Sequence, residues 1–217
     1  MKSLNSLAFA ASLVASVSAS AAVVMLDFEG IGDLVPVSNF YNGGAGGNLG
    51  VVFSPNAIAA IDIHQGGSAD IANQPSGKTV MALFDPSVMV SYAAGFTTGL
   101  SFFFSAGAAG EVDLYESLDG TGTPITKIFF SADPSFNCVG GKFCNWTAAG
   151  GAFTGIARSA VFVGDPFVTL FDNVTFGSAT PLVGGGGNVP EPTSIALVGI
   201  ALAGLGAISR RRVGSGK

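Results

Sequence analysis

The stretch Glu111-Val112-Asp113-Leu114-Tyr115-Glu116 alternates between polar and apolar side chains. Successive side chains of a β-strand point to opposite faces, so this alternation is typical of a strand with one buried face. We expect Val112 and Leu114 to face a core and Glu111, Asp113 and Tyr115 to face solvent. The turn signal Asp119-Gly120 follows, and then a second apolar run, Ile125–Ser131. The sequence therefore predicts a β-hairpin with a loop of about six residues.

The same pattern of short apolar runs and turns repeats along most of the chain. Glycine-, aspartate- and proline-rich turns separate the runs, and no helical periodicity appears between the two terminal segments. The predicted fold class is therefore all-β, a single β-sandwich or barrel. The further predicted strands are Val23–Phe28, Val51–Phe53, Ala57–Ile63, Thr79–Phe84, Val88–Tyr92, Leu100–Ser105, Ala157–Val163 and Phe167–Phe176.

The first residues have the composition of a secretory signal peptide, with a short apolar helix. Lys2 supplies a positive charge, Leu7–Val17 forms the apolar stretch, and Ala19-Ser20-Ala21 ends it with small residues. This order of charge, apolar run and small-residue site is what signal peptidase requires. We expect cleavage after Ala21 and export of the rest of the chain.

The C-terminal segment combines three features in a fixed order. Its prolines hold Val189-Pro190-Glu191-Pro192 extended, and Thr193 can begin a helix. The uncharged run Ser194–Ile208 would span roughly 23 Å as a helix, against about 30 Å for a hydrocarbon core. Arg210-Arg211-Arg212 then forms a basic stop, which the positive-inside rule places in the cytoplasm. We therefore predict a membrane helix over residues 193–209, with the domain outside.

This combination resembles the PEP-CTERM sorting signal of Gram-negative bacteria. In that family the signal is recognised by a membrane transpeptidase, an exosortase, which cuts near the Pro-Glu-Pro. The resemblance implies an exported protein that is anchored in the inner membrane and then processed to the cell surface or extracellular matrix. The same tail closes some proteins labelled ice-binding, a label that implies no ice binding here. An ordinary C-terminal membrane anchor is the alternative interpretation.

These features divide the chain into a signal peptide (1–21), a β-sandwich domain (22–178), a linker (179–188) and a sorting and anchor segment (189–212). Gly184-Gly185-Gly186-Gly187-Asn188 makes the linker flexible. Between the two terminal signals, thirteen carboxylates stand against four basic residues, a formal charge of about −9. Because nucleic-acid binding needs a basic surface, we expect no nucleic-acid partner.

The chain has two cysteines, Cys138 and Cys144, separated by a segment that contains Gly140-Gly141. In an exported protein, two neighbouring cysteines usually form a disulfide, and the glycines allow the tight reversal between them. We expect this bond to stabilise the domain by about 2 kcal/mol. The alternative is a metal pair, which would need further ligands, and His64 is the only histidine.

Carboxylates occur in both the first and the last predicted strand. Leu26-Asp27-Phe28-Glu29-Gly30 opens the domain, and Leu170-Phe171-Asp172-Asn173-Val174-Thr175-Phe176 closes it. Strand alternation places Asp172 on the same face as Val174 and Phe176. A carboxylate on an apolar face must be paired or must bind a cation.

These two ends resemble those of jelly-roll, galactose-binding-like domains, including many carbohydrate-binding modules. The resemblance implies a jelly-roll-like sandwich and a structural calcium ion, with Glu29 and Asp172 as ligands and Asp27 and Asn173 as helpers. Calcium takes six to eight oxygens, so backbone carbonyls would supply the remainder. The alternative is that Asp172 accepts hydrogen bonds from neighbouring backbone and that Glu29 is solvated. We expect no other cofactor.

We expect no catalytic activity. His64 is not accompanied by a G-x-S-x-G nucleophile motif anywhere in the chain. Glu111 with Asp113, or with Glu116, could be imagined as a glycosidase pair, since two carboxylates on the same face of a strand lie about 7 Å apart, a spacing that suits an inverting enzyme. Acidic residues on the outer face of a strand are, however, usually just solvated.

Four amphipathic aromatics, Tyr41, Tyr92, Tyr115 and Trp146, are candidates for stacking on sugars. The leading hypothesis is a non-enzymatic surface or matrix protein that contacts exopolysaccharide. The second is a calcium-stabilised carbohydrate-binding module, which would show a concave face with coplanar exposed aromatics. The third is a glycoside hydrolase on the same sandwich, which would need two facing carboxylates in a groove.

Overall fold

The structure, a computed structural model, describes residues 23–133 and 139–183. The predicted signal peptide, the membrane helix 193–209 and Cys138 lie outside these residues. No helix within the described ranges is long and apolar enough to cross a bilayer. The elements are β1 (Val24–Leu26), β2 (Asn42–Gly44), β3 (Gly47–Asn48), β4 (Val51–Phe53), β5 (Ala57–Ile61), the 3₁₀ helix η1 (Ile63–Gln65), β6 (Thr79–Leu83), β7 (Ser87–Ala106), β8 (Gly110–Tyr115), β9 (Thr126–Phe130), β10 (Thr147–Val163) and β11 (Thr169–Phe176).

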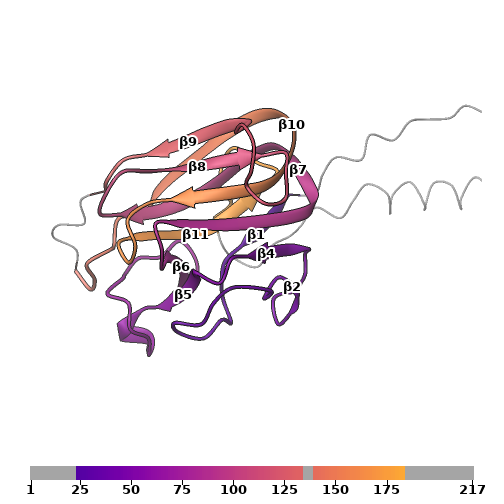
Figure 1. The fold of residues 1–217 in the computed structure, drawn as a ribbon. Coiled ribbons are helices and arrows are strands. Elements are labelled where there is room, and N and C mark those ends of the chain that lie inside the picture. Colours follow the sequence, from indigo (N-terminus) through magenta and orange to yellow (C-terminus); the bar gives the residue numbers. More distant parts are fainter. Residues whose placement is uncertain (1–22, 134–138, 184–217) are drawn as a thin grey trace, which may run out of the picture.

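The strands of the main sheet pair antiparallel, and their pairings fold into two layers (Figure 1). One layer contains β4, the first half of β7, the second half of β10, β8 and β9. The other contains β5, β6, β11 with β1, the second half of β7 and the first half of β10. The domain is therefore an all-β, jelly-roll-like sandwich, as the sequence predicts, and its layers share their two longest strands.

β7 and β10 pass from one layer to the other at a shared irregularity. Their register shifts between Phe153 and Ala157 of β10 and again before Ser159. Gly95 of β7 has a φ of 72°, and a Cβ at this position would lie 2.6 Å from Cγ2 of Ile156. A residue with a side chain does not fit there, and bulges of this kind bend and twist strands. The irregularity thus lets both strands serve two layers.

The core lies between the two layers and is rich in phenylalanine. Phe162 of β10 and Phe171 of β11 come from opposite layers, and their ring centroids are 4.9 Å apart. Phe102 of β7 packs edge-to-face on Phe171 at 5.2 Å, a favoured geometry for aromatic pairs. A second, smaller cluster covers the other face of β6 and β11, and consists of Ala60, Ile71, Val80, Phe143 and Leu170.

The largest differences between the predicted and the observed strands concern β7 and β10. Val88–Tyr92 and Leu100–Ser105 belong to the single long strand β7. β10 begins at Thr147, well before the predicted Ala157. Its first half is rich in alanine and glycine, which are depleted in strands, so its pattern carries no strand signal.

The predicted facing of the last strand is wrong after Asp172. Asn173 has a φ of 48°, and the register of β11 against β7 shifts just after Asp172. The extra residue reverses the alternation, as expected for a β-bulge. Val174 and Phe176 therefore pack in the main core, whereas Leu170, two residues before Asp172, belongs to the second cluster.

Replacing Phe102 by alanine should lower the free energy of unfolding by about 3–5 kcal/mol, because a fully buried ring is lost from the centre of the core. Phe129, which is 69% exposed, provides the matched control. The Phe129→Ala change should cost less than about 0.5 kcal/mol. Denaturant unfolding of both variants checks the prediction, and equal losses would contradict the assigned core.

Candidate functional site

Two carboxylates and one backbone segment form the best-defined polar site of the domain. Glu29 follows β1, Asp172 lies in β11, and both hold the segment Ser76–Thr79 that leads into β6. Oε1 of Glu29 accepts hydrogen bonds from the backbone N–H groups of Lys78 (2.8 Å) and Thr79 (2.7 Å). Asp172 accepts hydrogen bonds from the backbone N–H and the hydroxyl of Ser76, each at 2.9 Å. We call this arrangement the carboxylate clamp.

The clamp occupies a gap along one edge of β11. The edge that faces away from β7 pairs first with β6, where Phe171 lies opposite Met81, and then with β1, where Val174 lies opposite Leu26. Asp172 and Asn173 lie between these two pairings. The end of β1 and the start of β6 therefore meet at this point, which brings Glu29 and the Ser76–Thr79 segment to Asp172.

The backbone around the clamp adopts uncommon conformations. Phe28, Asn73 and Asn173 have φ values of 61°, 58° and 48°. Each such residue costs about 1–3 kcal/mol, so it persists only where surrounding contacts hold it, as they often do at functional sites. Gly77 has a φ of 41°, and a Cβ there would lie 2.2 Å from Cδ of Glu29. Any larger residue at position 77 would therefore displace the Glu29 carboxylate, which is held there by the N–H groups of Lys78 and Thr79.

The charge of Asp172 is costly at this position. The side chain is fully buried, and burial, followed by the charge of Glu29, raises its pKa to about 7. Hydrogen bonds from Ser76 and from the backbone of Asn173 act in the opposite direction by stabilising the carboxylate. The clamp therefore collects amide and hydroxyl donors, yet these donors do not fully compensate the buried charge.

The negative charges of the clamp also act on the hydroxyl group of Tyr41. Its buried hydroxyl oxygen accepts a 2.7 Å hydrogen bond from the backbone N–H of Phe28. Burial, and then the charges of Asp27, Asp172 and Glu29, hold the pKa of Tyr41 well above its usual range. Three carboxylates thus act on one phenol, which stays protonated.

Polar atoms beside the clamp remain without partners. Within the described residues, Oδ1 and Nδ2 of Asn173 and Oγ1 of Thr79 are buried and make no hydrogen bond. Burying such a group without a partner costs roughly 1–3 kcal/mol, and a bound water or cation would remove that cost. The described ranges contain no group of three or more His, Cys, Asp or Glu placed to hold a metal. A cation here would therefore take Glu29 and Asp172 and complete its shell with amide, hydroxyl and carbonyl oxygens.

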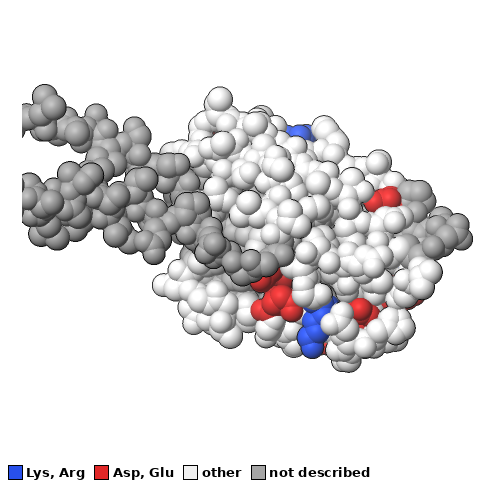
Figure 2. Space-filling view, turned by 180° about the vertical axis from the view of Figure 1, so that it is seen from behind, with Lys and Arg blue, Asp and Glu red and all other residues white. Residues whose placement is uncertain are grey.

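The acidic residues of β8 have a different environment from the one predicted. Asp113 is only 7% exposed, so the expectation that it faces solvent is wrong. Lys127 of β9 lies across it, with Nζ 2.7 Å from Asp113 and 2.8 Å from Glu111. These are the ion pairs found among residues 23–133 and 139–183, so the carboxylate clamp has none. Uncharged side chains cover most of the face of the domain that Figure 2 shows. The acidic side chains on this face gather in a few places.

The predicted aromatic residues do not form an exposed platform. Tyr41 is buried, and Tyr92, Tyr115 and Trp146 are half-buried. Nε1 of Trp146 donates a hydrogen bond to the carbonyl of Ala72, and its ring packs on the second cluster. The exposed aromatics of the described residues are instead Phe84, Phe129 and Phe167.

The remaining predicted residues have the following positions. His64 lies exposed in η1, where its backbone N–H donates to Asp62. Cys144 is buried, and the described part of the chain contains no free cysteine. Because Cys138 lies outside the described residues, the Cys138–Cys144 bond stays a prediction.

The terminal signals also lie outside the described residues. This applies to Ala19 and Ala21 of the cleavage site, to Val189-Pro190-Glu191-Pro192, and to the basic stop Arg210-Arg211-Arg212. The association of Ser76–Thr79 and Tyr41 with Glu29 and Asp172 was not predicted from the sequence. Backbone donors carry no residue signature, so only the fold reveals these contacts.

Comparison with known proteins assigns the C-terminal segment. Residues 188–212 match the family described as the PEP-CTERM protein-sorting motif. The chain therefore carries this motif where the sequence predicts it, on Val189 to Arg212. No curated protein matches the chain.

Several solved structures share part of the fold. The carbohydrate-binding module CsCBM6-3 from Clostridium stercorarium, in complex with cellobiose, is 14% identical, with 58% of this chain and 84% of that one covered and a TM-score of 0.37. The K2 cleaved adhesin domain of Lys-gingipain is 11% identical, with 71% and 97% covered and a TM-score of 0.46. Another family 6 carbohydrate-binding module is 16% identical, with 56% and 94% covered and a TM-score of 0.34. Such distant likenesses carry no argument about what this chain binds.

Replacing Gly77 by alanine should disrupt the clamp, because the new methyl group would collide with the Glu29 carboxylate. Gly122 is the control, since it also has a positive φ, of 97°, but a Cβ added there would meet nothing within 4 Å beyond its chain neighbours. Gly122→Ala should cost only the left-handed backbone strain, about 1–2 kcal/mol. Gly77→Ala should cost clearly more in chemical denaturation, and equal costs would contradict the close packing described here.

Proposed function

We propose that this chain is exported, held in the inner membrane by residues 193–209, cut by an exosortase, and then displayed at the cell surface or in the extracellular matrix. The observation that carries this proposal is the match of residues 188–212 to the PEP-CTERM sorting motif. In the proposal, the signal peptide 1–21 directs export, and Arg210-Arg211-Arg212 keeps the C-terminal end in the cytoplasm until cleavage.

The domain itself serves, in this proposal, as a non-catalytic module that contacts exopolysaccharide. The geometry of the acidic residues supports this assignment. Lys127 forms ion pairs with both Glu111 and Asp113. These two carboxylates therefore bind a lysine and do not face an open groove. The disulfide between Cys138 and Cys144 is part of the same proposal, because an exported domain encounters an oxidising compartment.

We further propose that a structural calcium ion completes the carboxylate clamp. Its support is the imbalance of charge, since Asp172 is fully buried beside Glu29 and no described ion pair reaches either residue. Two neutral oxygens of neighbouring residues are buried and unpartnered: Oδ1 of Asn173, which follows Asp172, and Oγ1 of Thr79, whose backbone N–H donates to Glu29. Calcium binds carboxylate, amide and carbonyl oxygens, so this donor set suits it.

In this proposal Glu29, Asp172 and Asn173 would hold the ion, and its role would be structural. It would neutralise the carboxylates and fix the junction between β1, β6 and β11. The left-handed backbone of Phe28 and Asn173 would then be maintained by the ion together with the hydrogen bonds of the clamp.

Processing can be tested by mass spectrometry of the protein recovered from fractionated cells. We expect the surface form to end near Pro190–Pro192 and to lack Arg210-Arg211-Arg212. Replacing the three arginines by glutamine should stop delivery, because the basic stop is lost, whereas Lys217→Gln should have no effect. An intact Arg212 on the surface form would refute exosortase cleavage and leave plain anchoring.

Calcium binding can be tested by thermal unfolding of the purified protein in EDTA and in excess calcium. A ligand at 100 times its Kd stabilises by about 2.7 kcal/mol, which corresponds to a rise in Tm of roughly 5–10 °C. Glu29→Gln and Asp172→Asn should abolish the rise, while Glu116→Gln, a change of an exposed acid, should keep it. The calcium proposal fails if wild-type Tm is the same in both buffers.

A further inference from the structure

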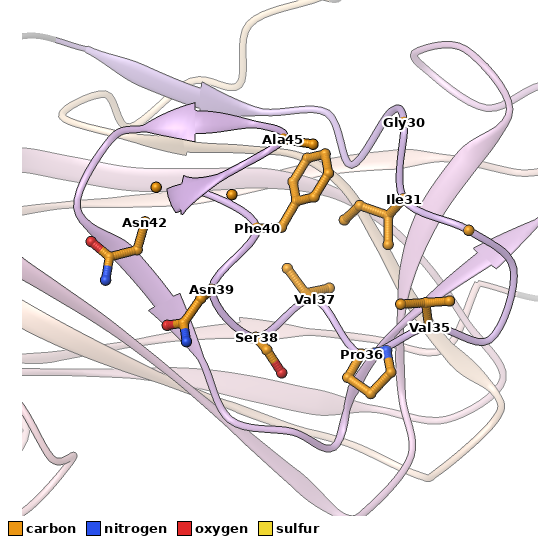
Figure 3. A pocket seen from close by; sticks show the side chains of 13 residues that line it. Gly30, Ile31, Val35, Pro36, Val37, Ser38, Asn39, Phe40, Asn42 and Ala45 are labelled. Carbon is orange, nitrogen blue, oxygen red and sulfur yellow. The ribbon is translucent and has the colours of Figure 1, made fainter.

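A pocket of about 460 Å³ opens in the connection between β1 and β4 (Figure 3). Thirteen residues between Gly30 and Ala45 line it, and none of them is charged. Its volume falls within the range of small-molecule sites, roughly 300–1,000 Å³. Neither the sorting motif nor the carboxylate clamp makes use of this pocket.

The lining separates into an apolar centre and a polar side. Phe40, Ile31 and Val37 group at the centre, and the amides of Asn39 and Asn42 lie to one side of them (Figure 3). Both asparagines are exposed, and each amide offers a donor and an acceptor. The pocket can therefore receive a molecule that has an apolar face and neutral, hydrogen-bonding edges.

The backbone around the pocket is pre-formed. The N–H of Val37 donates to the carbonyl of Ala57, and the N–H of Phe53 donates to that of Ser38, each at 2.9 Å. These bonds fix the lining segment to β5 and β4. A rigid site of this kind loses little conformational entropy when it binds a ligand.

The pocket is also linked to the carboxylate clamp. Gly30 and Ile31 follow Glu29 directly in the chain, and Phe40 precedes Tyr41, whose hydroxyl holds the backbone of Phe28. The start of the lining segment and Tyr41, which lies within that segment, are therefore both held next to the clamp. The hydrogen bond of Tyr41 and the bonds to β4 and β5 keep the pocket in shape.

We propose that this pocket binds an uncharged sugar unit of a polysaccharide, an inference that rests on the proposed display of the domain in the extracellular matrix. A pyranose ring presents C–H groups on its faces and hydroxyl groups on its edges, which matches the apolar centre and the asparagine amides. An acidic sugar finds no basic side chain in the lining and meets a domain with a formal charge of about −9. The ligand class is therefore neutral.

Affinity electrophoresis of the full-length protein in mild non-ionic detergent tests this proposal. Native gels would contain hydroxyethyl cellulose, dextran or galactomannan as neutral probes, and alginate as the acidic probe. We expect retardation by at least one neutral polysaccharide and none by alginate. Asn39→Asp and Asn42→Asp should each weaken the retardation about threefold to tenfold, as expected when one neutral hydrogen-bonding group is replaced.

The matched control is Asn48→Asp, which adds the same charge at an exposed asparagine of the same hairpin but outside the lining. It should be retarded like the wild type. The proposal is overturned if no neutral gel retards the wild type, if alginate retards it equally, or if the three variants behave alike. Cleavage near Pro190–Pro192 is measured separately, so failure of the sugar site and failure of the sorting proposal are distinguishable.

Discussion

The pairing of β7 with β10 is the interaction on which the rest of the domain depends. It extends from Val163 opposite Ser87 to Thr147 opposite Phe104, and so passes through both layers. The other strands add to the edges of this pair, β4 and β8 in one layer and β11 in the other. The two layers are thus joined by continuous strands in addition to side-chain packing, and neither layer can form completely without the other.

The carboxylate clamp follows from how β11 is bordered. On one edge β11 has β7 along most of its length, but on the other edge β6 and β1 meet end to end at Asp172 and Asn173. A buried strand edge needs partners for its polar groups. Asp172, Glu29 and the Ser76–Thr79 segment tie this junction together through side-chain hydrogen bonds in place of a regular ladder. The site is therefore where two strands end against a third.

The sequence predicts the strand content well because alternation and turn residues are local signals. Val112 and Leu114 are buried as predicted, but Asp113 is also buried, since Lys127 from the neighbouring strand covers it. Such cover depends on strand register, which a single strand does not encode. The first half of β10 is not predicted for a related reason. Its small residues carry no strand signal of their own, and their pairing with the long strand β7 holds them in the sheet.

The two acids of the clamp could be identified from sequence, whereas their surroundings could not. Asp172 is noticeable because it is a charge on the face of an apolar strand, whereas Glu29 is singled out through the resemblance of the two terminal strands to those of galactose-binding-like domains. The bulge at Asn173 reverses the facing that alternation predicts for Val174 and Phe176. The residue types in this strand do not indicate that a bulge is present. The donors on Ser76, Lys78 and Thr79 are mostly backbone groups brought in from a distant part of the chain.

The pairing of Val24 with Phe176 has a mechanical consequence. The first and last strands of the sandwich start and finish at the same corner, so a domain held from beyond Phe176 projects its opposite end away from the point of attachment. Tension from that attachment enters along β11, parallel to the strand axis, and loads the bonds to β7 and β1 together. Shear of this kind distributes a pulling force over many hydrogen bonds at once, in contrast to the one-by-one opening of a strand peeled from its end.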